Sequence, residues 1–197
     1  MTRLALIRHG LTEWNQQKRI QGHIDQPLSE AGRNQLRALA IPQDWRDADW
    51  YCSPLGRARE TADLLGLDHH QINDSLTEMH WGEWEGQILK PLRRQLGDVM
   101  RANEARGLDF RPPGGESPRE VQERLQPWLR AIAASNRDRV GAVVHKGIIR
   151  CIYGLATGWE LRGESPVEFA WDAMHLFELD TDGKLVNRYE SRPLKRV

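Results

Sequence analysis

Short apolar runs alternate with segments of helical periodicity along most of this chain. The runs at 3–7 (RLALI) and 140–144 (VGAVV) are almost wholly apolar, which is typical of strands buried on both faces in a parallel sheet. Alternating residues on both sides of Asp182-Gly183 predict a hairpin near the C-terminus. Strands that alternate with helices and end in a hairpin predict an α/β domain, with a mostly parallel sheet and one antiparallel strand.

Capping residues indicate where two of the helices begin. Ser29 is suited to the N-cap of a helix that stops before Pro42. Ser117 opens the clearest helix, because Glu120 completes a capping box with it. The segment 87–108 is interrupted by proline and glycine, so we expect it to be helical but irregular.

The charge of the chain argues against two classes of partner. The 197 residues include 28 Lys and Arg against 28 Asp and Glu, which gives a formal net charge of zero. A neutral protein lacks a general electrostatic attraction to nucleic acid or to an anionic membrane, so we expect neither as a partner. A local basic pocket stays compatible with this balance, and so does a homodimer.

The two cysteines and the N-terminal segment bear on the cellular compartment. Cys52 and Cys151 both lie in apolar surroundings, as buried thiols do in a reducing compartment. The first residues lead directly into a strand-like run, without the basic and apolar regions of a signal peptide. We therefore expect a cytoplasmic protein.

Two of the apolar strands end in a histidine, His9 after the first and His145 after the second. Ligands of open α/β sheets gather beyond the carboxyl ends of the strands, so both imidazoles are expected on one rim. Arg8 is on that rim already, and Arg57 follows a third strand in a turn that enters a helix. Two histidines and two arginines in one cleft predict a local site for phosphate oxygens.

Six ordered segments resemble the histidine phosphatase superfamily, in its phosphoglycerate mutase-like branch. They are RHGLTEWN (8–15), QGHIDQPLSEAG (21–32), SPLGRARETA (53–62), LTEMHWGEWEG (76–86), PPGGES (112–117) and VVHKGIIR (143–150).

The resemblance implies a single domain over 1–197, with the fold of a three-layer α/β/α sandwich. Residues 80–115 would form a lid-like insertion over the site. The sheet would be six-stranded and mixed, and its fifth strand would be antiparallel. The implied strands lie near 3–8, 49–53, 70–74, 140–145, 174–180 and 185–190.

The resemblance also implies a role for each site residue. His9 would be the nucleophile that forms phosphohistidine, and Arg8, Arg57 and His145 would hold the non-bridging oxygens. Glu78 would protonate the leaving alkoxide and then act as base on the hydrolytic water. Gly10 would leave room for the phosphoryl group, and Trp81 and Trp84 would shield Glu78 from water.

The same resemblance indicates four substrate-binding positions: Asn15, Gln21, Gly22 and Lys146. The family commonly has glycine directly after the second histidine, whereas this chain has Lys146 followed by Gly147. The Lys146 side chain either points to solvent or adds positive charge at the rim of the pocket. The second case would favour substrates with an additional anionic group.

The implied activity is a phosphatase that hydrolyses a small phosphorylated metabolite without a metal ion or other cofactor. The sequence has no clustered carboxylates of the kind that hold Mg²⁺. Mutase-type phosphoryl transfer, a phosphohistidine protein phosphatase and a non-catalytic anion-binding module remain alternatives. A cysteine-dependent phosphatase would need five residues between Cys52 and Arg57, but only four intervene.

Overall fold

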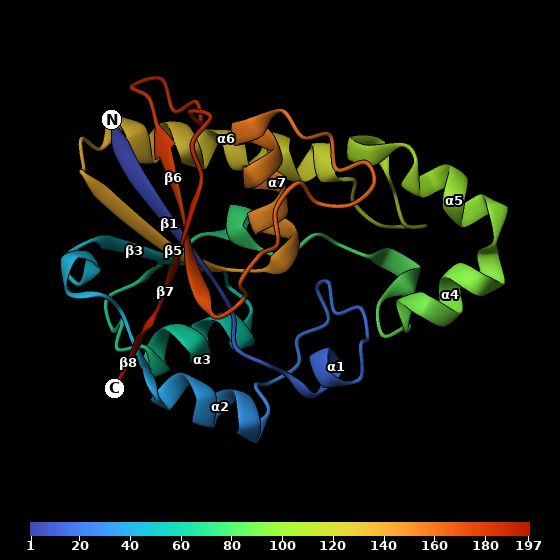
Figure 1. Ribbon diagram of the computed structural model, residues 1–197, viewed down its shortest axis with the longest axis horizontal. Coiled ribbons are helices and arrows are strands. Elements are labelled where there is room, and N and C mark those ends of the chain that lie inside the picture. Colours follow the sequence, from blue (N-terminus) through green and yellow to red (C-terminus); the bar gives the residue numbers. More distant parts are fainter.

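The computed structural model describes residues 1–197 and is built around one six-stranded sheet (Figure 1). Its strands are β1 (Thr2–Arg8), β3 (Asp49–Cys52), β4 (Gln71–Ile72), β5 (Arg139–Val144), β6 (Ala173–Leu179) and β7 (Glu190–Pro193). The strand order is β4-β3-β5-β1-β6-β7, and β6 runs antiparallel to the other five strands. The mixed sheet with one antiparallel strand is confirmed.

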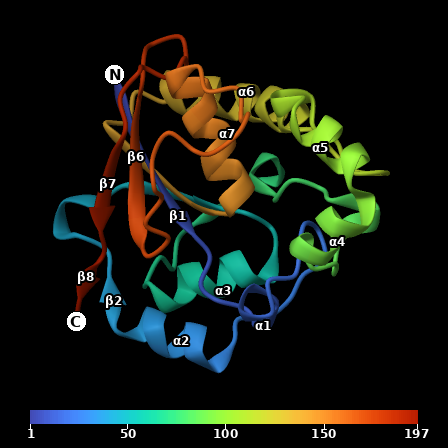
Figure 2. The ribbon, with the colours of Figure 1, turned by 45° about the vertical axis from the view of Figure 1, so that its right-hand side comes forward.

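Helices cover both faces of this sheet. The helices of the whole chain are α1 (Glu13–Gln16), α2 (Glu30–Arg37), α3 (Gly56–Leu64), α4 (Leu89–Leu96), α5 (Asp98–Glu104), α6 (Pro118–Ala134) and α7 (Lys146–Thr157). Helices α6 and α7 lie on one face of the sheet, and α2 and α3 lie on the other (Figures 1 and 2). None of these helices is both long enough and apolar enough to span a bilayer.

Strand β1 shows why the sandwich has two cores. Its neighbours are β5, parallel, and β6, antiparallel, so its backbone is paired on both edges. Leu4 and Leu6 are fully buried in the core with α6 and α7, whereas Ala5 and Ile7 belong to the core beneath α2 and α3. Because successive side chains point to opposite faces, an apolar run is required to fill both cores.

The expected capping residues begin both helices. The Ser29 hydroxyl accepts the N–H of Gly32 at the start of α2. Ser117 and Glu120 form the expected capping box of α6. Helix α2 is shorter than expected, because the chain leaves it to form β2 (Leu39–Ala40), which pairs with β8 (Lys195–Arg196).

The segment 80–115 projects from one side of the sandwich (Figure 2). It contains α4 and α5, which are separated by Gly97 with a φ of 51°. Three buried residues, Trp84, Leu92 and Met100, form a small separate core within it. The short 3₁₀ helices of the chain are Gln43–Trp45, Asp74–Leu76, Gly82–Trp84 and Gly107–Asp109.

The last strand departs from the expected range of 185–190 and begins only at Glu190. The turn at Asp182-Gly183 does form, because the Asp180 carboxylate accepts backbone N–H groups within it. After one bridge beyond the turn, the pairing breaks off. Tyr189 there turns inward to pack against other aromatic rings, so the ladder resumes only with the next residue.

Candidate active site

The carboxyl ends of β1, β5 and β3 bring three polar residues together beneath one rim. His9 follows β1, and its N–H donates to the carbonyl of Val144 over 2.9 Å. His145 follows β5 and caps α7, and Ser53 follows β3. The ring centroids of His9 and His145 are 5.1 Å apart. The two strand-end histidines, 136 residues apart in sequence, therefore lie side by side.

The hydrogen bonding of His9 fixes which ring nitrogen is free. Its Nδ1 lies 2.7 Å from the carbonyl oxygen of Gly10. Since a carbonyl only accepts, Nδ1 carries the proton and Nε2 keeps its lone pair in the neutral ring. Burial lowers the pKa of His9 well below its usual value, and the positive charges of Arg8 and Arg57 lower it further. His9 is thus a neutral imidazole near pH 7, with Nε2 available for attack.

His145 is fully buried and is held by Ser53, whose Oγ lies 2.7 Å from its Nε2. Its Nδ1 has no partner within the protein. Burial lowers the pKa of His145 well below its usual value, and Arg57 and His9 add to this effect. This neutral ring therefore keeps one nitrogen for a further contact beside His9.

Arg57, in the first turn of α3, has a fully buried side chain. Its Nη2 donates to the carbonyl of Gly22 over 2.7 Å, and its Nη1 donates to Asp25 over 3.1 Å and to the Ile24 carbonyl over 3.2 Å. Burial lowers the pKa of Arg57, whereas the charges of Glu78 and Asp25 oppose that shift. The guanidinium is thereby fixed in position by the loop 21–25, and its Nε stays without a partner.

Glu78 is buried, and backbone donors hold its carboxylate. Its Oε1 accepts the N–H of Met79 over 2.8 Å, and its Oε2 accepts the N–H of Gly147 over 3.0 Å. Arg124 of α6 donates to the carbonyl of Thr77 over 2.8 Å and to that of Glu78 over 3.4 Å. Two helices therefore position this carboxylate.

Most of these groups line one cavity of about 490 Å³, which we call the His9 cavity. It is lined by Arg8, His9, Leu11, Asn15, Lys18, Arg19, Ile20, Gln21, Gly22, Arg57, Glu78, Trp81, Leu89, Lys146, Gly147 and Arg150. Of the catalytic and substrate-binding residues expected from the sequence, all line it except His145, whose ring lies beside that of His9. Its six cationic side chains face a single carboxylate, that of Glu78.

Buried donors and acceptors without protein partners gather around this cavity. Five of the eight such atoms in the protein belong to the site: Arg8 Nε, Gln21 Oε1, Arg57 Nε, His145 Nδ1 and Arg150 Nε. Buried polar groups are normally hydrogen-bonded, so a cluster of unpartnered ones indicates a binding site. Because four of the five are nitrogens, three of them in guanidinium groups, the site suits an anion.

Sequence reasoning missed three residues of the site: Lys18, Arg19 and Arg150 line the His9 cavity as further cations. It also missed Trp171, whose ring lies 5.2 Å from Arg8 Cζ and 5.3 Å from Lys146 Nζ. The motif HKGIIR contains Arg150, so this residue could have been found from its helical spacing to Lys146. Trp171 lies in an irregular segment and carries no comparable signal.

Three expected contributions differ in detail. A Cβ on Gly10 would meet Leu36 Cδ1 at 2.6 Å, so this glycine permits packing against α2 rather than space for a ligand. Trp84 is buried in the small core of the segment 80–115, so of the two tryptophans only Trp81 lines the His9 cavity. Asn15 uses its Oδ1 in a capping box with Thr12, which leaves its amide nitrogen free to donate.

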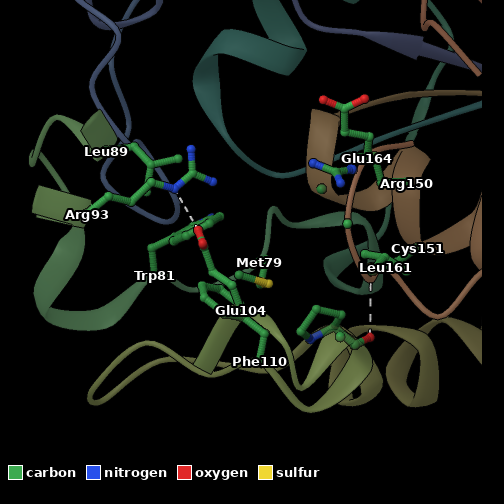
Figure 3. Close-up of a pocket in the computed structure, with 14 residues that line it drawn as sticks. Met79, Trp81, Leu89, Arg93, Glu104, Phe110, Arg150, Cys151, Leu161 and Glu164 are labelled. Atoms are coloured by element: carbon green, nitrogen blue, oxygen red, sulfur yellow. Dashed lines mark hydrogen bonds and ion pairs between the residues drawn. The ribbon is translucent and has the colours of Figure 1, made fainter. Parts of the chain in front are cut away.

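A second cavity of about 410 Å³ adjoins the first and shares Trp81, Leu89, Gly147 and Arg150 with it (Figure 3). We call it the adjoining cavity. It mixes apolar side chains with charges, and its Arg93 and Glu104 form an ion pair of 2.7 Å. The remaining lining residues are Met79, Gly107, Phe110, Pro118, Cys151, Leu161, Gly163 and Glu164.

The arrangement combines a neutral imidazole, fixed cations and one positioned carboxylate. This combination can bind a phosphoryl group, attack it and handle a proton beside it. No group of three or more His, Cys, Asp or Glu side chains is placed to hold a metal ion. Burial raises the pKa of Cys52 to about 12, so this thiol stays protonated and is a poor nucleophile.

Comparison with known proteins agrees with this geometry. Residues 4–191 match the model of the histidine phosphatase superfamily, branch 1. The chain is 28% identical to the phosphoglycerate mutase-like protein 4 of Arabidopsis thaliana, over 90% of this chain and 80% of that protein. It is 33% identical to a metal-independent phosphoserine phosphatase of the same plant, over 78% of this chain and 68% of that protein.

Solved structures show the same fold. A mycobacterial glucosyl-3-phosphoglycerate phosphatase in complex with VO₃ superposes with a TM-score of 0.80 and 26% sequence identity. The match covers 99% of this chain and all of that one. The resemblance therefore extends over the whole sandwich and the segment 80–115.

Proposed function

This chain belongs to the histidine phosphatase superfamily, branch 1, and on that premise we propose that His9 is the nucleophile of its reaction. The chain is a phosphoric monoester hydrolase, as its phosphatase relatives are. The observation that supports the role of His9 is its Nδ1–H bond to the Gly10 carbonyl in a cavity of cations. This bond leaves the lone pair of Nε2 free in a cavity that Arg8 and Arg57 also line.

In the first step, Nε2 of His9 forms a bond to phosphorus while the bond from phosphorus to the ester oxygen breaks. Arg8, Arg57 and the free Nδ1 of His145 stabilise the charge that spreads over the non-bridging oxygens. Glu78, protonated when the substrate is bound, gives this proton to the leaving oxygen and becomes a carboxylate, so that a neutral alcohol departs.

In the second step, a water molecule attacks the phosphohistidine. Glu78, now a carboxylate, takes the proton of that water as the phosphorus–oxygen bond forms. The phosphorus–nitrogen bond breaks, its electron pair returns to Nε2 of His9, and phosphate is released. Each group thereby returns to its starting state, and no metal ion takes part, as the name of the plant phosphoserine phosphatase also states for that relative.

The substrate we propose is a small phosphorylated metabolite. Relatives are named for phosphoserine and for glucosyl-3-phosphoglycerate, which are phosphate esters of small molecules. The His9 cavity of about 490 Å³ suits a ligand of this size. Both cysteines are free and buried, which supports a cytoplasmic location for the hydrolase.

The test is to trap the intermediate. Substrate labelled in its phosphoryl group should leave label on the protein as an acid-labile, base-stable adduct, and His9→Ala should abolish both the adduct and phosphate release. His69→Asn is the matched control, because His69 is exposed and lies outside the cavity. A rate that falls with EDTA, or label that appears in an isomer of the substrate instead of inorganic phosphate, would contradict the proposal.

A further inference from the structure

We propose that Lys146 and Arg150 form a second anion site on the leaving-group side of the His9 cavity. The substrate would then be a phosphomonoester whose leaving group carries another oxyanion, a carboxylate or a second phosphate. This inference rests on the proposed function, because it takes the phosphoryl group to lie at His9.

Helix α7 places the two cations in order along the cavity. His145 caps this helix beside His9, Lys146 is its first residue, and Arg150 follows four positions later. Four residues amount to about 6 Å along a helix axis and lie on the same face. Lys146 lines the His9 cavity alone, whereas Arg150 lines both this cavity and the adjoining one. An anion held by both cations would therefore lie farther along α7 from His145 than a phosphoryl group beside that residue.

Neither cation is neutralised by the protein. Lys146 and Arg150 form no ion pair and no side-chain hydrogen bond, and Arg150 Nε is buried without a partner. Each lies over an indole instead: Lys146 Nζ is 5.3 Å from the Trp171 ring centroid, and Arg150 Cζ is 5.1 Å from that of Trp159. An aromatic face can hold a cation in place while its N–H groups remain free to donate.

Of the other cations around the two cavities, Arg8 and Arg57 belong to the phosphoryl site, and Lys18 is unpaired but exposed at the rim. Arg19 already donates to Gln17 and to the Gly86 carbonyl. In the adjoining cavity the carboxylate of Glu104 is occupied by Arg93, and Glu164 is exposed at the rim, beyond ion-pair distance of Arg150 (Figure 3).

The phosphoryl group itself does not account for the charges of Lys146 and Arg150. Phosphate esters carry about two negative charges. The unpartnered donors near His9, which are Arg8 Nε, Arg57 Nε and His145 Nδ1, are available to meet them. Burial lowers the pKa of both Lys146 and Arg150, so keeping them charged and unpaired costs free energy. An oxyanion of the substrate would offset that cost.

Two matched pairs of substrates test the inference. 3-Phosphoglycerate and glycerol 3-phosphate differ only by a carboxylate in place of a hydroxymethyl group. 1,3-Propanediol bisphosphate and its monophosphate differ only by the second phosphate. In one of the pairs, the wild type should favour the substrate with the additional oxyanion, 3-phosphoglycerate or the bisphosphate, by at least tenfold in kcat/KM. The pair that shows this preference identifies the oxyanion.

Single variants then assign the preference to its residues. Lys146→Met and Arg150→Met should each reduce the preference at least tenfold, mainly through KM, as expected for loss of a charge-assisted hydrogen bond. The preference is a ratio of two kcat/KM values measured on one preparation, so the fraction of folded protein cancels from it. Lys90→Met is the control, since it removes an exposed charge of α4 that lines neither cavity, and the preference should persist.

The outcomes separate this inference from the proposed function. Hydrolysis of glycerol 3-phosphate through His9 with no preference in either pair would overturn the second anion site and leave the phosphatase intact. A preference that survives in both variants would also overturn it. If no phosphomonoester at all is hydrolysed, both proposals are wrong.

Discussion

The N–H of Gly147 donates to Oε2 of Glu78 over 3.0 Å, so the first turn of α7 holds the carboxylate beside His9. A Cβ on Gly147 would lie 2.3 Å from Oε1 of the same carboxylate. The backbone of Gly147 is not in the left-handed region, so close approach rather than conformation requires glycine here. This contact explains why position 147 requires glycine.

We predict that Gly147→Ala lowers kcat at least tenfold, because the new methyl group must displace the Glu78 carboxylate. The thermal midpoint should change little, because the higher helix propensity of alanine, up to about 1 kcal/mol over glycine, offsets the cost of displacing the carboxylate. Steady-state kinetics and thermal unfolding measure the two effects. In a Glu78→Ala background the same substitution should add almost nothing, and additive losses in the double variant would contradict this explanation.

The central strands, and the gathering of the strand-end residues at one cavity, could be predicted from the sequence for a physical reason. Strands buried on both faces leave a nearly unbroken apolar signal, and two of them here, β1 and β5, are followed by a histidine at the same rim. The positions of Trp171 and Tyr189 depend instead on packing between irregular segments that are far apart in sequence. Such contacts leave no periodic pattern in the sequence that could predict them. The displaced start of β7 follows from one of them, the packing of Tyr189.

Trp171 supports two cations of the site with a single ring, and we predict that its loss weakens phosphate binding. Trp171→Leu should raise the inhibition constant of inorganic phosphate about tenfold, because Arg8 and Lys146 both lose a cation–π contact of about 0.5–2 kcal/mol. Trp171→Phe keeps an aromatic face and should recover most of the affinity. Equal effects of the two variants would show that the ring acts only through its volume.

The capping box of α6 provides a stability prediction that is independent of catalysis. The Ser117 hydroxyl accepts the N–H of Glu120, and the Glu120 carboxylate accepts the N–H of Ser117 over 2.8 Å. Ser117→Ala should lower the free energy of unfolding by about 1 kcal/mol. Urea denaturation measures this loss, and KM for any phosphomonoester should stay unchanged. A change in KM would mean that loss of the cap reaches as far along α6 as Arg124 and disturbs its contact with Glu78.

His175 makes the stability of the fold depend on pH. It is fully buried on β6, and burial lowers its pKa to about 4. Below pH 6.5 the unfolded chain binds a proton at this residue that the folded chain does not bind. Each pH unit between 6.5 and about 4 therefore lowers the free energy of unfolding by about 1.4 kcal/mol, to a total of about 3 kcal/mol, whereas above pH 6.5 the residue has no such effect.

We predict that His175→Phe removes this part of the pH dependence. At pH 7 the variant should be less stable than the wild type, because the contact between Nδ1 and the Tyr189 hydroxyl at 3.0 Å is lost. As the pH falls to 4 the difference should shrink or reverse, while the slopes due to His9 and His145 persist in both proteins because their pKa values are also lowered. Urea denaturation at each pH measures the difference, with His69→Asn as the exposed control. A difference that stays constant from pH 7 to pH 4 would show that His175 titrates alike in the folded and unfolded chains.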